Sequence, residues 1–159
     1  MNRPRPGLPA LALALATAGG LSPAAIADEG DAAILDPTPD IKVNGSDGPL
    51  TVSPLEPVQI TVALDPGLHL GQPADVYGIG ELVVAGMSVY FSVVYPDRVV
   101  PGERPYLQIP LLPVPRTEVY QGRLPPGHWF LHFGVDANAD GIVDWDWFDT
   151  VEVRVGPVE

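Results

Sequence analysis

The chain has 159 residues, with 20 Asp and Glu against 8 Lys and Arg, a formal net charge of −12 and no cysteine. An acidic chain whose few Lys and Arg are scattered is a poor match for nucleic acid or for an anionic membrane surface. The lack of cysteine excludes a disulfide framework, a thiolate metal site and a thiol nucleophile.

The first 27 residues have the pattern of a secretory signal peptide. Arg3 and Arg5 give a positive start, residues 8–21 form an apolar run, and Ala25-Ile26-Ala27 offers a small-residue cleavage site. The run is shorter than the ~20 apolar residues that a membrane-spanning helix requires. We therefore expect residues 1–27 to be removed, leaving a secreted or periplasmic protein without a membrane span.

The remaining chain divides into a leader and one domain. Residues 28–40 are predicted to be a flexible acidic leader, because acidic and small residues alternate there with Pro37 and Pro39 and show no sustained periodicity. Residues 41–156 consist of short apolar or alternating runs separated by Gly, Pro, Asn and Asp. This pattern predicts an all-β fold, an immunoglobulin-like two-sheet antiparallel sandwich of about seven strands.

The expected strands can be placed in chain order. Residues 58–64 alternate between apolar and mostly polar side chains, which indicates one buried face. Residues 76–84 and 88–95 are apolar enough for central strands, with Ala85-Gly86 as a tight turn between them. The other extended segments are 41–43, 50–53, 106–112, 118–124, 128–135 and 150–155.

Residues 128–135 are predicted to have two unlike faces. Trp129 and the alternate residues after it are apolar and are expected in the core, whereas His128 and His132 are expected to face solvent. Four residues along a strand correspond to roughly 13 Å, so the two imidazoles cannot share a zinc ion.

Between the last two expected strands lies the segment Asp136-Ala-Asn-Ala-Asp-Gly-Ile-Val-Asp144. Oxygen-bearing side chains occupy its first, third, fifth and ninth places and a glycine its sixth, which is the spacing of calcium loops. A hard divalent cation needs several oxygens from one short segment, and the glycine permits the sharp bend. The predicted calcium ligands are the side chains of Asp136, Asn138, Asp140 and Asp144 and the carbonyl of Ile142.

A plain polar hairpin turn is the alternative to a calcium site, because Asp140-Gly141 suits such a turn. Like charges crowded into one loop destabilise the fold unless a cation is bound, which favours the metal. The acidic residues concerned are Asp136, Asp140, Asp144, Asp146 and Asp149.

The loop resembles the Asp-x-Asn-x-Asp-Gly-x-x-Asp loops that lie in β-hairpins, as in the propeller domains of integrin α chains. That resemblance implies that Asp144 closes the ligand shell. Helix-loop-helix calcium proteins have Glu at the twelfth place, whereas this chain has Trp147 there and expected strands on both sides. Residues 41–155 also resemble uncharacterised immunoglobulin-like modules of secreted bacterial proteins, which implies a fold and a compartment but no activity.

Trp145 and Trp147 suggest a second kind of site. If the segment is extended, both indoles project to one side about 7 Å apart and could stack on a sugar. Alternatively, they could cover the open end of the sandwich.

Three functions are therefore carried forward. The favoured one is a secreted, non-enzymatic structural or interaction module, stabilised by calcium at its last hairpin and binding an unidentified protein or glycan. The others are a carbohydrate-binding module that uses Trp145 and Trp147, and an enzyme whose site matches no recognised motif. The sequence has no Gly-x-Ser-x-Gly elbow to indicate a serine hydrolase.

Overall fold

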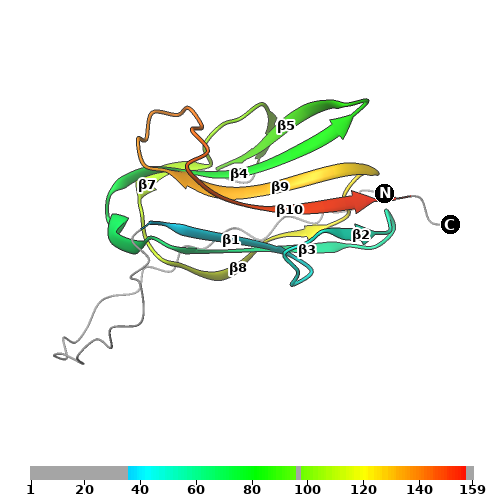
Figure 1. The fold of residues 1–159 in the computed structure, drawn as a ribbon, viewed down its shortest axis with the longest axis horizontal. Helices are drawn as coiled ribbons and strands as arrows, with labels where there is room; N and C mark the ends of the chain where they lie inside the picture. The colour runs from blue at the N-terminus through cyan, green and yellow to red at the C-terminus, as the bar shows by residue number, and fades with distance from the viewer. Residues whose placement is uncertain (1–35, 96–97, 157–159) are drawn as a thin grey trace, which may run out of the picture.

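Strands of the predicted kind form two sheets in the computed structural model, which describes residues 36–95 and 98–156 (Figure 1). The smaller sheet has three strands in the order β1-β3-β8, and the larger has seven, in the order β2-β10-β9-β4-β5-β6 with β7 paired to β4. The predicted all-β, two-sheet fold is confirmed. The strands are β1 (Thr38–Val43), β2 (Leu50–Val52), β3 (Val58–Asp65), β4 (Pro73–Val84), β5 (Met87–Val94), β6 (Arg98–Pro101), β7 (Leu107–Pro110), β8 (Val114–Gly122), β9 (Gly127–Asp136) and β10 (Trp147–Val155).

The strand count and one strand direction differ from the prediction. The described residues contain ten strands rather than about seven. Nine of them lie in the segments expected to be extended, including the short strands β2 and β7, and only β6, with four residues and little periodic signal, was not expected. β2 pairs with β10 in parallel, whereas the other strand pairs are antiparallel. The sandwich is therefore antiparallel except at this edge.

The first strand begins inside the predicted leader. β1 starts at Thr38, and its first three residues pair with the end of β3. Pro39 lowered the strand signal in the sequence, but β1 is an edge strand of the smaller sheet, where a proline is tolerated. The predicted signal peptide and the leader up to residue 35 lie outside the described residues.

The hydrophobic core lies between the two sheets. The alternation in β3 is confirmed, because Val58, Ile60, Val62 and Leu64 are all buried. Burying a side chain of this size contributes about 1.5–3 kcal/mol relative to leaving it exposed. Opposite them, the larger sheet contributes Ala74 of β4, Trp129, Leu131, Phe133 and Val135 of β9, and Val151, Val153 and Val155 of β10.

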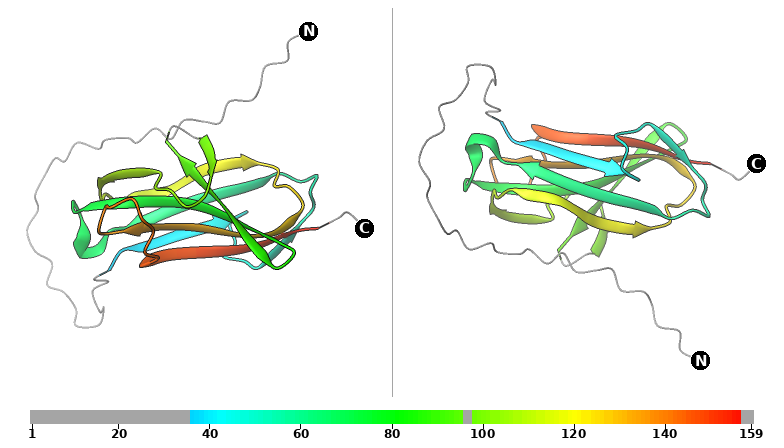
Figure 2. Two further views of the ribbon diagram at one scale, coloured as in Figure 1. Left: turned by 90° about the horizontal axis from the view of Figure 1, so that it is seen from above. Right: turned by 90° about the horizontal axis from the view of Figure 1, so that it is seen from below.

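Strands of both sheets run along the long axis of the molecule, and the β4–β5 hairpin crosses them at an angle (Figure 2). The hairpin turns at Ala85 and Gly86, whose φ angles of 50° and 79° are those of the two-residue turn that the sequence predicts. No helix among the described residues is long and apolar enough to cross a membrane.

Candidate metal site

The acidic segment is the tip of the last hairpin, as predicted. β9 ends at Asp136, β10 begins at Trp147, and the two strands pair along nine residues from Val135 opposite Trp147 to Gly127 opposite Val155. The connecting loop, residues 137–146, rises from the larger sheet on the side away from the smaller sheet (Figure 1).

Side chains at alternate positions give the loop its curvature. Asp136 Oδ1 accepts a hydrogen bond from the backbone N–H of Asn138 at 3.0 Å, and Asn138 Oδ1 accepts one from Asp140 at 3.1 Å. Asp140 Oδ1 continues the series by accepting from the N–H of Ile142 at 2.8 Å. Gly141 has a φ of +82°, which makes the bend that its place in the calcium-loop pattern predicts. These hydrogen bonds are Asx turns, in which a side-chain oxygen accepts from the backbone N–H two residues further along.

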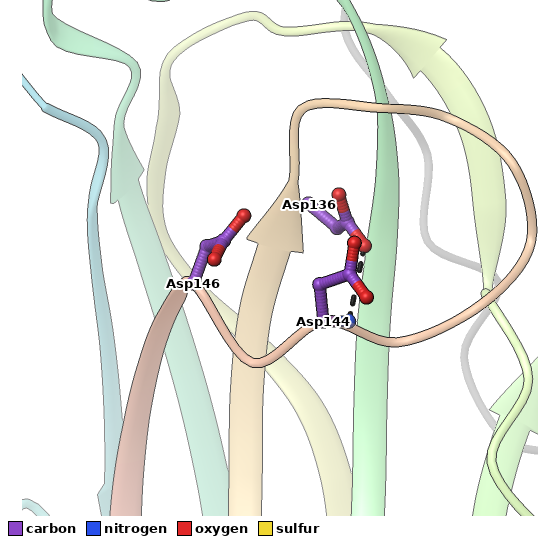
Figure 3. A group of neighbouring side chains, drawn as sticks. All are labelled: Asp136, Asp144 and Asp146. Atoms are coloured by element: carbon purple, nitrogen blue, oxygen red, sulfur yellow. Dashed lines mark hydrogen bonds between the residues drawn. The ribbon is translucent and has the colours of Figure 1, made fainter.

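Three carboxylates converge where the loop closes (Figure 3). One oxygen from each of Asp136, Asp144 and Asp146 lies within 4.8 Å of the other two. Calcium binds oxygens at about 2.4 Å, so two oxygens on opposite sides of one ion are about 4.8 Å apart. The spacing of these three oxygens meets that limit, which makes the three acids a candidate ion site. Asp136 is fully buried at the end of β9, and the other two are exposed.

The predicted ligand set is only partly brought together. Asp136 and Asp144 meet, whereas Asn138 presents its amide nitrogen there: Nδ2 donates to Asp144 Oδ2 at 2.5 Å, and Oδ1 accepts from the N–H of Asp140. Asp140 is not in the group of three acids. Asp146 takes part although the loop pattern does not include it.

Asp149 belongs to a different part of the structure. Its Oδ2 accepts a hydrogen bond from the backbone N–H of Ile41 and its Oδ1 one from Thr150, both at 2.8 Å. Four of the five acidic residues expected to crowd the loop therefore remain there, and the fifth joins β10 to β1.

The charges of the loop disfavour ionisation of Asp144. Partial loss of water contact raises the pKa of this carboxyl, and the neighbouring Asp136, Asp140 and Asp146 raise it further, against the opposing hydrogen bond from Asn138. The ion pairs among the described residues involve other acids, so no lysine or arginine there compensates the loop.

The neighbouring strand β4 adds a buried acid that the sequence does not predict. Asp75 lies directly opposite Asp136 in the β4–β9 pair and is fully buried. Its Oδ2 accepts a hydrogen bond from the N–H of Gly141 at 2.7 Å, whereas its Oδ1 has no partner. The hydroxyl of Tyr77, two residues along β4, is also buried without a partner. Burial, followed by the nearby charges with Asp75 first, raises the pKa of Tyr77.

The two tryptophans of the loop end contact different faces of the larger sheet. Trp147 packs against the core and lies 4.8 Å from the ring of His69. The ring centre of Trp145 lies 5.0 Å from that of His132 and 4.5 Å from that of Phe148, and both of these residues lie on the face away from the core. A sugar platform made of both indoles needs a common face, and this arrangement does not provide one.

The predicted exposure of His132 is wrong. Its side chain points away from the core as expected, but the ring is covered and the residue is 9% exposed. Nδ1 lies 2.8 Å from Thr150 Oγ1, and Nε2 lies 3.3 Å from Glu81 Oε2. Trp145 packs edge-on against the ring. The loop therefore supplies the cover that the strand pattern alone does not reveal.

The packing under the loop depends on Gly134 of β9. A Cβ at this position would lie 2.4 Å from Cγ of Phe148 and 2.4 Å from the carbonyl oxygen of Trp147. The ring of Phe148 also packs against Tyr77, with ring centres 5.9 Å apart. The start of β10 can lie close to β9 because residue 134 has no side chain.

No protein-family model matches the chain, and neither do the curated proteins nor the solved structures with which it was compared.

Proposed function

We propose that this chain is a secreted, non-enzymatic structural or interaction module, an immunoglobulin-like β-sandwich whose last hairpin is stabilised by a bound calcium ion. The observation that carries the proposal is the convergence of Asp136, Asp144 and Asp146 within 4.8 Å. Secretion is inferred from the signal-peptide pattern of residues 1–27.

A bound cation explains the charge of the loop better than a plain turn does. Carboxylates this close repel one another, and the described lysines and arginines do not pair with them. One divalent ion among the three acids would turn this repulsion into attraction.

The donor atoms favour calcium among the common divalent ions. The candidate ligands are carboxylate, amide and carbonyl oxygens, which suit hard cations, whereas zinc and copper sites usually include His or Cys. Calcium accepts irregular shells of six to eight oxygens, which a loop built of Asx turns and two exposed acids can supply together with water. Magnesium requires near-octahedral geometry and is the less suitable ion.

The ion is assigned a stabilising role because its candidate ligands join consecutive elements of the fold. Asp136 ends β9, Asp144 lies in the loop, and Asp146 precedes β10. An ion held by all three would fix the tip of the hairpin and, through it, the cover over Tyr77 and His132.

Calorimetric titration of the mature protein with calcium tests the proposal. We expect saturable binding and a melting temperature that is higher in millimolar calcium than in chelator. At a calcium concentration of 100 times Kd, linkage adds about 2.7 kcal/mol to the free energy of unfolding. Magnesium at the same concentration serves as the control ion and should raise the melting temperature less.

The Asp144→Asn variant should lose most of the response, and Asp47→Asn, which changes an exposed acid in the β1–β2 turn, should keep it. Absence of heat change together with the same melting temperature in calcium and in chelator would overturn the proposal.

A further inference from the structure

We propose that the neighbouring strand β4 completes this ion site, with Asp75 and Tyr77 holding a water molecule that is itself a ligand of the ion. The inference rests on the proposed calcium site and adds two residues outside the loop pattern.

Strand pairing places Asp75 beside the loop. It lies directly opposite Asp136, and side chains at such positions share one face of the sheet with Cβ atoms about 4.5–5.5 Å apart. Its chain neighbours Ala74 and Val76 pack on the core, so Asp75 and Tyr77 point to the other face, where the loop lies.

The carboxylate of Asp75 faces the loop, and only one of its two oxygens has a hydrogen-bond partner. Its Oδ2 accepts the N–H of Gly141, the sixth residue of the calcium-loop pattern, at 2.7 Å. Its Oδ1 is buried without a hydrogen-bond partner. A buried carboxylate oxygen without a partner is costly, so such an atom next to three converging acids indicates a cation or a cation-bound water at this point.

Tyr77 provides a second buried group without a partner on the same face. Its hydroxyl lacks a hydrogen bond, and among the nearby charges Asp75 acts on it most strongly, followed by Asp136. A single water molecule bound between these two groups, both on the face of β4 where the loop lies, would give each of them a partner.

The chemistry of a water ligand fits both groups. Its oxygen can bind the ion with one lone pair and accept a hydrogen bond from the Tyr77 hydroxyl with the other, while one of its O–H groups donates to Asp75 Oδ1. Calcium loops commonly include one ligand position that acts through water. A water-mediated role also agrees with the fact that Asp75 does not lie within 4.8 Å of all three of Asp136, Asp144 and Asp146.

The test is calcium titration of the wild-type mature protein, Asp75→Asn and Tyr77→Phe, with melting curves in chelator and in calcium. Asparagine retains an acceptor for the Gly141 N–H but cannot accept from the water. We expect the Kd for calcium to rise about 10-fold or more in both variants, as for other residues that orient a metal ligand. In chelator, neither variant should melt below the wild type, because each replaces a buried group that lacks a partner.

Asp65→Asn is the matched control, because Asp65 also accepts a backbone N–H from a glycine, Gly67, at 2.9 Å, but at a turn outside the loop. It should bind calcium as the wild type does. Unchanged Kd values in both β4 variants, or equal losses of melting temperature in chelator and in calcium, would overturn the inference while the wild-type titration still supports the site. A wild type that binds no calcium would overturn both proposals.

Discussion

Asp149 in β10 accepts a hydrogen bond from the backbone N–H of Ile41 in β1, and the two strands belong to different sheets. β1 is the edge strand of the smaller sheet, so this N–H has no strand partner on that side. The carboxylate therefore closes the sandwich on the edge where β1 and β10 face each other.

Replacing Asp149 by Ala should destabilise the fold. The N–H of Ile41 would be left without its acceptor, and loss of a partly buried hydrogen bond to a charged group costs about 1–3 kcal/mol. Urea denaturation in chelator measures the effect. Asp47→Ala is the control, because Asp47 forms an exposed ion pair with Lys42, which contributes about 1 kcal/mol or less. Equal midpoints for the two variants would contradict the role given to Asp149.

Gly134→Ala should destabilise the protein by about 1–3 kcal/mol, as overpacking does in other proteins. The added methyl group would meet both the Phe148 ring and the Trp147 carbonyl at 2.4 Å, and the backbone carbonyl cannot move without disturbing the hairpin. Gly78→Ala in β4 is the matched control, since a Cβ there meets nothing within 4 Å. We expect it to be neutral or slightly stabilising in the same denaturation experiment. A stable Gly134→Ala variant would show that the start of β10 can shift.

Acidification should weaken the fold through His132. Burial lowers the pKa of His132 below its usual value of 6.5, against the opposing effect of Glu81. Below pH 6.5 the unfolded chain therefore binds a proton that the folded protein binds less readily. The free energy of unfolding should fall as the pH decreases from 6.5 to the lowered pKa. Above pH 6.5 the contribution of His132 is fully present and should not change further with pH.

Denaturation between pH 5.5 and 7.5 in chelator, compared with His132→Gln, measures this contribution. The variant should show a shallower dependence on pH in this range. An identical slope in the two proteins would mean that His132 does not titrate differently on folding.

Asp144→Asn should affect the ion-free and ion-bound proteins in opposite directions. Without an ion, partial loss of water contact and then the charges of Asp136, Asp140 and Asp146 raise the pKa of Asp144 and disfavour its charge, so neutralising it should leave the melting temperature equal or higher. With calcium, loss of a ligand should raise the Kd about 10-fold or more. Melting curves in chelator and calcium separate the two effects. A variant that melts lower in chelator and retains its calcium affinity would assign Asp144 to the turn alone.

Period-two patterns predicted the fold where strands are long and have two unlike faces. β3 and β9 were recognisable because their apolar residues alternate, and these residues fill the core. The β4–β5 turn was recognisable because Ala85-Gly86 separates two apolar runs, and both residues adopt positive φ there. The parallel pairing of β2 with β10 could not be predicted, because a three-residue strand does not encode its neighbour.

Loop spacing predicted the acids that are close in sequence. Asp136 and Asp144 follow from the calcium-loop pattern, but Asp75 is 66 residues from its partner Gly141 and depends on the β4–β9 register. The expectation that Trp145 and Trp147 share a face assumed an extended segment. Trp145 has a φ of 58°, in the left-handed region, so the alternation breaks two residues before β10 begins.

Trp145 stands between Asp144 and Asp146, two of the three converging acids, while its indole rests edge-on against the imidazole of His132 and is 39% exposed. Any rearrangement of those carboxylates must also move the indole relative to that imidazole and to water. We expect the emission of Trp145 to report on the loop without an added dye, and Trp145→Phe would identify the part of the signal that comes from this residue.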